Sequence, residues 1–270
     1  MILDDIAEKR KEQLERDIGK VPLNEVRAAA EEAAKKDTGR SFKNALTSLP
    51  RPAIIAEVKK ASPSKGIISE DFRPSEQAVS YQNAGAAAVS CLTEEYYFKG
   101  SAEYFKAVRK VIDIPMIRKD FIIDPYQIYE AKAMGADAIL LIAAILDTEQ
   151  MKEYREIAES LKMDVLAESH NETELTSVIN AGCTIFGINN RNLKDFSVTL
   201  DTTKRLAGLV PEGGIIVAES GIKTAGDMKF LADCGANAVL IGETLMRSGS
   251  VEASLEASVE ASVKELRSLL

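Results

Sequence analysis

The chain has 270 residues, enough for one large α/β domain, and an apolar share of 46% excludes a largely disordered protein. Its net charge of −8 argues against a broad nucleic-acid-binding surface, although an acidic protein can still bind phosphate through backbone N–H groups and a few lysines. Because the sequence contains neither a long uncharged apolar stretch nor a secretory signal, we expect a cytoplasmic protein that enters no membrane.

Residues 1–50 have the pattern of helices. Pro22 breaks this pattern, and the apolar positions among the many charged ones are Ile2, Leu3, Ile6, Leu14 and Ile18. We predict a helical N-terminal extension that either packs on the following domain or caps one of its ends.

Eight short apolar runs follow the extension. They cover 53–59, 86–93, 115–120, 136–143, 164–169, 185–191, 215–221 and 238–243. Helix-like stretches separate many of them, among them 74–84, 125–134, 148–162, 172–180 and 224–233. Near-continuous apolar runs that alternate with helices are typical of parallel strands covered on their outer faces.

An internal repeat favours a closed barrel. Gly85, Gly135, Gly182 and Gly235 each stand just before an even-numbered run, and they are 50, 47 and 53 residues apart. Glycine suits the end of a helix that turns straight into a strand, and each interval has room for two β-α units. A doubly wound open sheet would not need eight units, and the first unit lacks a GxGxxG turn. We therefore predict an α/β fold of the (β/α)8 TIM-barrel type.

We take the whole chain, 1–270, as one domain in which 1–50 is the extension that caps the barrel. The four-residue repeat of 251–263 places its apolar residues on one helical face. We predict that this segment is the final barrel helix, and we assign it no function.

Polar and charged residues end several of these runs: Glu57, Lys59, Lys119, Glu168, Asn189 and Glu219. Glu57 and Lys59 are two residues apart, so they share one face of the first strand. A single Glu-x-Lys pair is more often a structural ion pair, but three glutamates and two lysines at equivalent strand ends are costly to bury without a ligand. The active site of such a barrel lies at the carboxyl ends of its strands, so we predict that these side chains form it.

Two turns that contain glycine predict a phosphate site. Ser220-Gly221 follows the seventh run, and Gly242-Glu243 follows the eighth. Either glycine alone is best explained by a tight turn. Together they follow the last two strands, where such barrels often hold a phosphate on backbone N–H groups.

Further candidates lie in loops and at apolar strand ends. The loop 60–66 is polar and basic, so it is either a solvated loop or a mobile flap that carries Lys59 and Ser62 toward an anion. Four apolar residues are either core or the wall for an aromatic ring: Phe98, Phe121, Leu140 and Leu193.

The rarer residue types argue against metal and triad chemistry. His170 is the only histidine, which disfavours a histidine-based metal site or a Ser-His-Asp triad. Cys91, Cys183 and Cys234 form no CxxC pair and are typical of small buried residues in a reducing compartment. We expect no metal ion.

Six motifs together resemble one family. They cover 55–66, 92–101, 118–124, 187–193, 218–222 and 240–243. In this order they resemble the indole-3-glycerol-phosphate synthase family of tryptophan biosynthesis, over essentially the whole chain and including the extension. Ser169, Cys91 and Tyr97 depart from the usual residues of that family, but none of these changes removes a chemical group.

The resemblance implies ring closure of 1-(2-carboxyphenylamino)-1-deoxyribulose 5-phosphate to indole-3-glycerol phosphate, CO2 and water, without a cofactor. In this family pattern Lys119 is the general acid at the ketone oxygen, and Glu168 is the base of the dehydration. Either Lys59 or Lys119 expels the hydroxyl group, and Glu57 orients Lys59.

The resemblance also implies how the substrate is held. Asn189, Glu219 and Ser220 hydrogen-bond its polar chain, and Arg191 supports the site. The phosphate end matches Ser62, Gly221, Gly242 and Glu243, and the aromatic ring matches the wall of Phe98, Phe121, Leu140 and Leu193.

The fold alone leaves two other functions open. Lys119 or Lys59 could form a Schiff base in another sugar-phosphate lyase, or the protein could bind a phosphosugar without turnover. The expected partner is a small phosphorylated molecule. The oligomeric state and any association with other tryptophan-pathway enzymes stay open.

Overall fold

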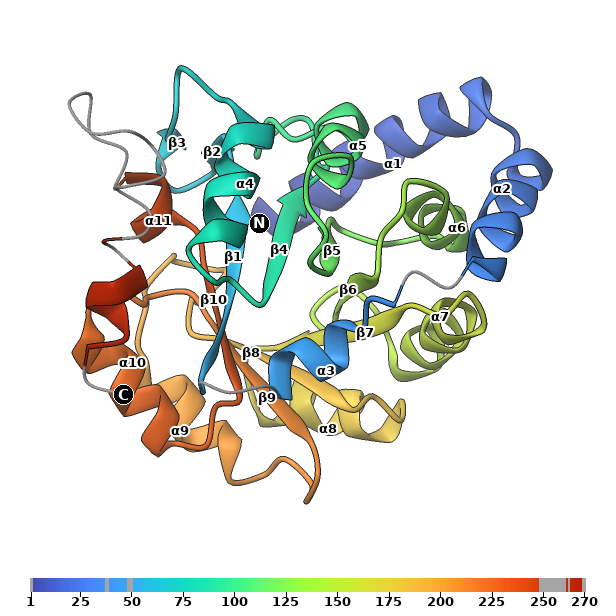
Figure 1. Ribbon diagram of the computed structural model, residues 1–270. Helices are drawn as coiled ribbons and strands as arrows, with labels where there is room; N and C mark the ends of the chain where they lie inside the picture. Colours follow the sequence, from blue (N-terminus) through green and yellow to red (C-terminus); the bar gives the residue numbers. More distant parts are fainter. Residues whose placement is uncertain (1, 37–38, 48–50, 248–260, 262, 269–270) are drawn as a thin grey trace.

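The computed structural model describes residues 2–36, 39–47, 51–247, 261 and 263–268. Within them, eight parallel strands close into a barrel: β1 (Ala53–Val58), β4 (Ala88–Leu92), β5 (Met116–Lys119), β6 (Ala138–Ile142), β7 (Asp164–Ser169), β8 (Ile185–Asn189), β9 (Ile215–Glu219) and β10 (Ala238–Ile241). Neighbours pair in the order β1-β10-β9-β8-β7-β6-β5-β4, and helices surround the ring (Figure 1). The predicted TIM barrel is confirmed.

The barrel helices include the five helix-like stretches that the sequence predicted, together with three shorter helices at 102–109, 201–207 and 243–247 that it did not name. They are α4 (Pro74–Asn83), α5 (Ala102–Arg109), α6 (Pro125–Ala133), α7 (Thr148–Ser160), α8 (Glu172–Asn180), α9 (Asp201–Ala207), α10 (Ala225–Asp233) and α11 (Glu243–Arg247). Side chains of Asp124, Asp147, Asn171 and Thr224 accept backbone N–H groups of the first turn, which fixes where α6, α7, α8 and α10 begin. Of the predicted final helix, residues 251–260 and 262 lie outside the described residues.

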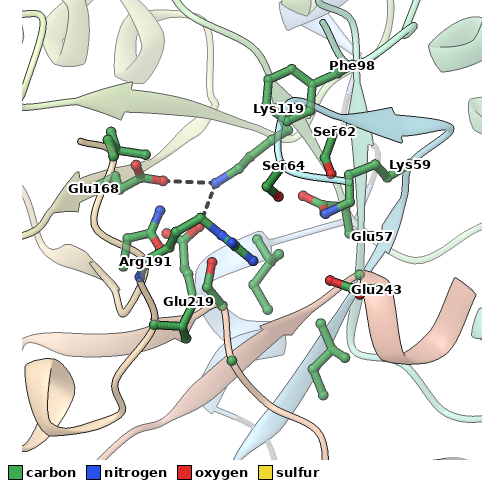
Figure 2. A pocket seen from close by; sticks show the side chains of 18 of the residues that line it. Glu57, Lys59, Ser62, Ser64, Phe98, Lys119, Glu168, Arg191, Glu219 and Glu243 are labelled. Atoms are coloured by element: carbon green, nitrogen blue, oxygen red, sulfur yellow. Dashed lines mark hydrogen bonds and ion pairs between the residues drawn. The ribbon is translucent and has the colours of Figure 1, made fainter. Parts of the chain in front are cut away.

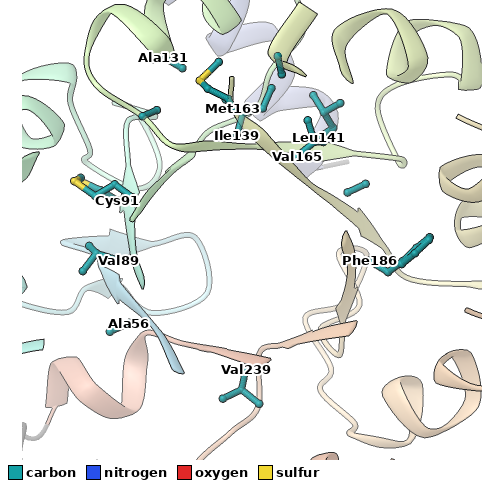
Figure 3. Packing of buried hydrophobic residues seen from close by; sticks show 14 of the residues in the cluster. Ala56, Val89, Cys91, Ala131, Ile139, Leu141, Met163, Val165, Phe186 and Val239 are labelled. Atoms are coloured by element: carbon teal, nitrogen blue, oxygen red, sulfur yellow. The ribbon is translucent and has the colours of Figure 1, made fainter. Parts of the chain in front are cut away.

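Successive side chains of each strand alternate between the barrel interior and the helix layer. On β1, Ile55 belongs to the interior cluster with Leu166 and Val217, whereas Ile54 belongs to the outer cluster. Figure 3 shows side chains of the outer cluster, such as Val89, around the ring of strands. Most strand residues are buried on both faces of the barrel sheet, which explains why the strands appear in the sequence as near-continuous apolar runs.

The loop after β1 contains a small hairpin. Strands β2 (Ala61–Ser62) and β3 (Gly66–Ile67) pair antiparallel, and Ile67 is 57% exposed. The polar character of this loop was predicted, but the hairpin was not, because strands of two residues leave no periodic pattern.

The N-terminal extension consists of α1 (Ile2–Lys20), α2 (Leu23–Lys35) and α3 (Phe42–Thr47), with the predicted break at Pro22. Helix α2 packs against α6. Helix α3 places Phe42 and Leu46, both fully buried, in the interior cluster. The backbone N–H of Lys43 donates to the carboxylate of Asp164, which begins β7, so α3 lies at the amino ends of the strands. We infer that the extension closes this end of the barrel and that the chain forms one domain.

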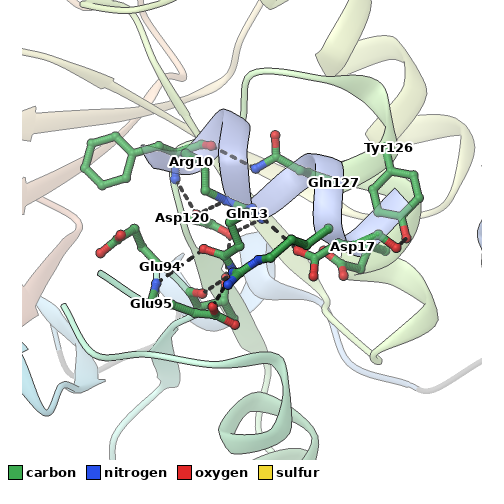
Figure 4. A network of polar contacts seen from close by, with 12 residues as sticks. Arg10, Gln13, Asp17, Glu94, Glu95, Asp120, Tyr126 and Gln127 are labelled. Carbon is green, nitrogen blue, oxygen red and sulfur yellow. Dashed lines mark hydrogen bonds and ion pairs between the residues drawn. The ribbon is translucent and has the colours of Figure 1, made fainter. Parts of the chain in front are cut away.

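Helix α1 lies at the opposite end, where a buried polar network anchors it (Figure 4). Arg10 donates from Nε and Nη2 to the two carboxylate oxygens of Asp120, at 3.0 and 3.1 Å. Arg118 and Thr93 also donate to Asp120, at 2.9 and 2.6 Å. Burial by itself raises the pKa of Asp120, but the two guanidinium groups outweigh it and hold that pKa below its usual range. Because Asp120 follows Lys119, this network ties the extension to the predicted site.

None of the helices in the described ranges is long and apolar enough to cross a bilayer.

The contact between α3 and the barrel interior predicts a stability effect. Phe42→Ala should lower the free energy of unfolding by about 3–5 kcal/mol, because the side chain is fully buried and leaves a cavity. Urea denaturation followed by circular dichroism measures this change. Leu209→Ala, at a position 51% exposed, is the control and should change it by less than about 0.5 kcal/mol. An equally small loss for Phe42→Ala would contradict the inferred closure.

Candidate active site

A pocket of about 780 Å³ opens at the carboxyl ends of the barrel strands. It brings together every residue that the sequence singled out as catalytic or substrate-binding: Glu57, Lys59, Ser62, Phe98, Lys119, Phe121, Leu140, Glu168, Asn189, Arg191, Leu193, Glu219, Ser220, Gly221, Gly242 and Glu243. Leu3 and Ile6 of α1 line it as well, so the extension contributes to its wall.

The centre of the pocket is a lysine held between two carboxylates (Figure 2). The Nζ atom of Lys119 lies 3.0 Å from Oε2 of Glu168 and 2.5 Å from Oε2 of Glu219. All three side chains are nearly inaccessible to solvent. An unpaired charge in such surroundings would destabilise the folded protein, so the three groups stabilise one another as a set.

The barrel geometry produces this cluster. Inward-facing side chains of a TIM barrel form layers, and each layer takes one residue from every second strand. Here β1, β5, β7 and β9 contribute Glu57, Lys119, Glu168 and Glu219 to the uppermost such layer. Two residues earlier on the same strands, Ile55, Ile117, Leu166 and Val217 belong to the apolar interior cluster.

Lys59 and Glu57 form a second ion pair across the pocket, with Nζ and Oε2 2.5 Å apart. Two glycines leave room for the carboxylates. A Cβ atom on Gly242 would lie 2.4 Å from Oε2 of Glu57, and one on Gly187 would lie 2.5 Å from Oε1 of Glu219. Larger residues at either position would displace the charged groups.

Neighbouring charges set the protonation states of the central cluster. Burial by itself lowers the pKa of Lys119, but Glu168 and Glu219 outweigh it, and the pKa lies above its usual range. Burial raises the pKa of Glu168, but Lys119 and His170 reverse this effect and hold it well below its ordinary value. For Glu219 burial dominates, and together with the negative charges of Glu168 and Glu57 it outweighs Lys119 and raises the pKa to about 7. The cluster therefore combines a protonated amine with an ionised carboxylate at neutral pH.

The turn after β9 has an unusual backbone that a buried asparagine supports. Ser220 and Gly221 both have positive φ, at 67° and 87°. Asn190 donates from Nδ2 to the Ser220 carbonyl at 3.2 Å, and its Oδ1 accepts from the N–H and the hydroxyl of Thr203 at 3.1 and 2.8 Å. Left-handed backbone is strained for serine, so these bonds help to hold the turn in place.

An apolar wall closes the side of the pocket next to β4 and β5. The rings of Phe98 and Phe121 have centroids 6.0 Å apart. The loop that carries Phe98 is organised by the buried carboxylate of Glu94, which accepts the backbone N–H groups of Tyr96, Tyr97 and Phe98 at 2.8 Å each. A planar aromatic group fits against such a wall.

The loop after β1 reaches the other side of the pocket. Lys65 lies 4.0 Å from Glu243, and Ser62 lines the pocket next to Lys59. Among the described residues, no group of three or more His, Cys, Asp or Glu side chains is arranged to hold a metal ion.

Residues 3–257 match the family model of indole-3-glycerol phosphate synthase. The chain belongs to the indole-3-glycerol phosphate synthase family. It is 46% identical over 268 residues to the indole-3-glycerol phosphate synthase of Alkaliphilus metalliredigens, covering 99% of this chain and 98% of that relative. It is 49% identical over 255 residues to that of Ruminiclostridium cellulolyticum, covering 94% of this chain and 97% of the relative.

Solved structures that are distant in sequence share the barrel. A mutant tryptophan synthase α-subunit from Pyrococcus furiosus superposes with a TM-score of 0.59 at 16% identity, over 79% of this chain and 97% of that one. Thiamine phosphate pyrophosphorylase from the same organism gives 0.58 at 16% identity, over 80% of this chain and 94% of the other. At this identity the likeness shows the fold alone.

Sequence reasoning missed several residues that shape this synthase site. Glu94 and Asn190 act through backbone contacts between distant segments, which no sequence spacing reveals. His170 was set aside as a lone histidine, yet its Nε2 lies 3.4 Å from Glu168. The two residues are two positions apart at the end of one strand, and this spacing could have indicated that their side chains lie close together.

The support of the turn by Asn190 predicts a defect in substrate binding. Asn190→Ala should raise KM by about tenfold and lower kcat much less, because it frees the Ser220 turn without touching the charged cluster. Steady-state kinetics of indole-3-glycerol phosphate formation measures both constants. Lys194→Ala, at an exposed position of the same loop, is the control and should leave both unchanged. An unchanged KM in Asn190→Ala would show that the turn does not depend on this side chain.

Proposed function

We propose that the charged layer carries out the indole-3-glycerol phosphate synthase reaction of this family by general acid–base catalysis. The substrate would be 1-(2-carboxyphenylamino)-1-deoxyribulose 5-phosphate. The observation that carries the proposal is the Lys119 ammonium group held between Glu168 and Glu219 in a buried pocket. An acid and a base thus lie within hydrogen-bond distance of one another, facing the same cavity.

Lys119 serves as the acid of the condensation step. The ring carbon that bears the carboxylate attacks the ketone carbon, and negative charge develops on the ketone oxygen. A proton from Nζ of Lys119 neutralises that oxygen, and loss of CO2 then restores the aromatic ring. The raised pKa of Lys119 supports this role, because the amine holds its proton until the substrate oxygen becomes basic.

Glu168 serves as the base of the dehydration. Removal of the new hydroxyl group needs a proton donor at its oxygen and a base for the proton that leaves the substrate. The lowered pKa of Glu168 supports the second role, because the carboxylate is ionised at neutral pH. Lys59, paired with Glu57, and Lys119 both face the pocket and both suit the role of donor.

The remaining pocket residues hold the substrate. Asn189, Glu219 and Ser220 suit its polar chain, and the Asn189 side chain accepts the backbone N–H of Arg191 at 3.0 Å. The phosphate would lie at the end formed by Ser62, Gly221, Gly242 and Glu243, and the aromatic ring against Phe98, Phe121, Leu140 and Leu193.

A Schiff-base mechanism fits this site less well. Such a lysine must be neutral to attack a carbonyl group, which requires a lowered pKa. Lys119 has the opposite environment, with Glu168 and Glu219 in contact with its amine. A binding protein without turnover would have no use for the buried acid and base.

We also propose that the protein works in the cytoplasm on this small phosphorylated substrate. The three cysteines, Cys91, Cys183 and Cys234, are free thiols, which suits a reducing compartment.

The proposed acid predicts the effect of one substitution. Lys119→Met should reduce kcat by at least about a thousandfold, because the isosteric side chain fills the same space but donates no proton. Formation of indole-3-glycerol phosphate, followed by its absorbance, measures the loss, and circular dichroism checks the fold. Lys110→Met, at an exposed position, is the matched control and should keep full activity. Turnover within tenfold of the unaltered protein would exclude Lys119 as the acid.

A further inference from the structure

The imidazole of His170 lies between two carboxylates. His170 follows β7, two residues after Glu168, and its Nε2 is 3.4 Å from Oε1 of Glu168. Its Nδ1 is 2.9 Å from Oε2 of Glu174, in the first turn of α8. His170 is not among the residues that line the pocket.

Glu174 is itself fixed in position. Its carboxylate accepts the backbone N–H of His170 at 2.8 Å and the side-chain amide of Asn171 at 2.7 Å. Asn171 caps α8 by accepting the backbone N–H of Glu174 at 3.0 Å. The start of α8 therefore sets the orientation of the imidazole ring.

The geometry favours a protonated ring. An ionised carboxylate only accepts hydrogen bonds, and a neutral imidazole has one nitrogen that cannot donate. With Nδ1 donating to Glu174, a neutral ring would aim the lone pair of Nε2 at Glu168. Nε2 is buried and makes no hydrogen bond, and the carboxylate of Glu168 faces it at 3.4 Å. A proton on Nε2 turns this contact into an ion pair.

We propose that His170 is a positioning residue for the catalytic base, held as an imidazolium by Glu174 and keeping Glu168 oriented and ionised when Lys119 turns to the substrate. The inference rests on the proposed role of Glu168. Oε2 of Glu168 contacts Lys119, while Oε1 faces His170, so the carboxylate is held at both oxygens. When Lys119 donates its proton, His170 is the cation that remains beside the base.

The surrounding charges support this assignment. Burial by itself lowers the pKa of His170, but Glu168 and Glu174 outweigh it and raise the pKa to about 10. The groups that act on Glu168 from the other elements are Lys119 of β5 and Glu219 of β9. Of these only Lys119 is a cation, and the reaction uses it.

Because His170 is the only histidine, its imidazole signals in the NMR spectrum need no assignment among other histidines and can be titrated directly. We would compare the unaltered protein with Glu174→Gln and His170→Asn, and measure the pH dependence of kcat over the range in which circular dichroism shows the fold intact. Glu172→Gln is the matched control, because Glu172 lies in the same helical turn but is exposed and pairs with Arg205.

The expected results separate positioning from mere structural support. The imidazole of the unaltered protein and of Glu172→Gln should stay protonated through pH 8, and the imidazole of Glu174→Gln should lose its proton at least one pH unit earlier. In His170→Asn the acidic limb of the kcat–pH profile should move up by about one pH unit, which is a tenfold loss at any pH on that limb. In Glu174→Gln the ring is still protonated at those pH values, so the limb should stay in place. KM should change little, because His170 does not face the pocket.

Two outcomes would overturn the proposal. One is an imidazole in the unaltered protein that titrates near pH 6.5, the ordinary value. The other is an acidic limb that stays in place in His170→Asn, even if kcat falls uniformly. Glu168→Gln separates this failure from failure of the proposed function: if that variant retains turnover, Glu168 is not the base, whatever the imidazole does.

Discussion

The architecture of the pocket depends on one buried interaction, the contact of the Lys119 ammonium group with the carboxylates of Glu168 and Glu219. None of these charges would be stable alone in the barrel interior, since an unpaired buried ion costs several kcal/mol. Together they fix their own positions and protonation states. The same contacts that make the cluster stable keep the amine charged and the Glu168 carboxylate ionised, as the proposed roles of acid and base require.

The rest of the fold holds the side chains of this charged layer apart and leaves them open to the pocket on one side. Beneath it lies the apolar interior cluster, into which Phe42 and Leu46 of α3 pack at the amino ends of the strands. Gly187 and Gly242 leave the space that the carboxylates need. Buried polar side chains then shape the loops above the layer: Glu94 organises the loop of the aromatic wall, and Asn190 holds the turn after β9. Helix α1 is bound to the same end of the barrel, because its Arg10 donates to Asp120, the residue after Lys119. The extension is therefore connected to both ends of the barrel.

The sequence predicted the barrel and the set of pocket residues because both follow from local patterns. Parallel strands buried on both faces appear as apolar runs, and the charged residues that end them must converge in a closed barrel. It did not predict which charges touch. The bond of Lys119 to both Glu168 and Glu219 depends on the register of strands 49 and 100 residues apart. The pattern of residues 1–50 showed apolar helix faces but not what they cover, so the insertion of α3 into the barrel end stayed open. His170 was judged by the chemistry it could do alone, whereas its contacts are with Glu168 and Glu174.

The central claim is that the carboxylates on either side of Lys119 keep it a protonated acid throughout the working pH range. The most direct test is an NMR titration of the protein with 15N-labelled lysine side chains, in which the Lys119 signal is the one absent from a Lys119→Met sample. The structure predicts a Lys119 ammonium signal that persists from pH 6 to pH 10. When both Glu168 and Glu219 are changed to glutamine, the amine should lose its proton at a lower pH than in the unaltered protein. A Lys119 amine that is already neutral at pH 8 in the unaltered protein would contradict this account.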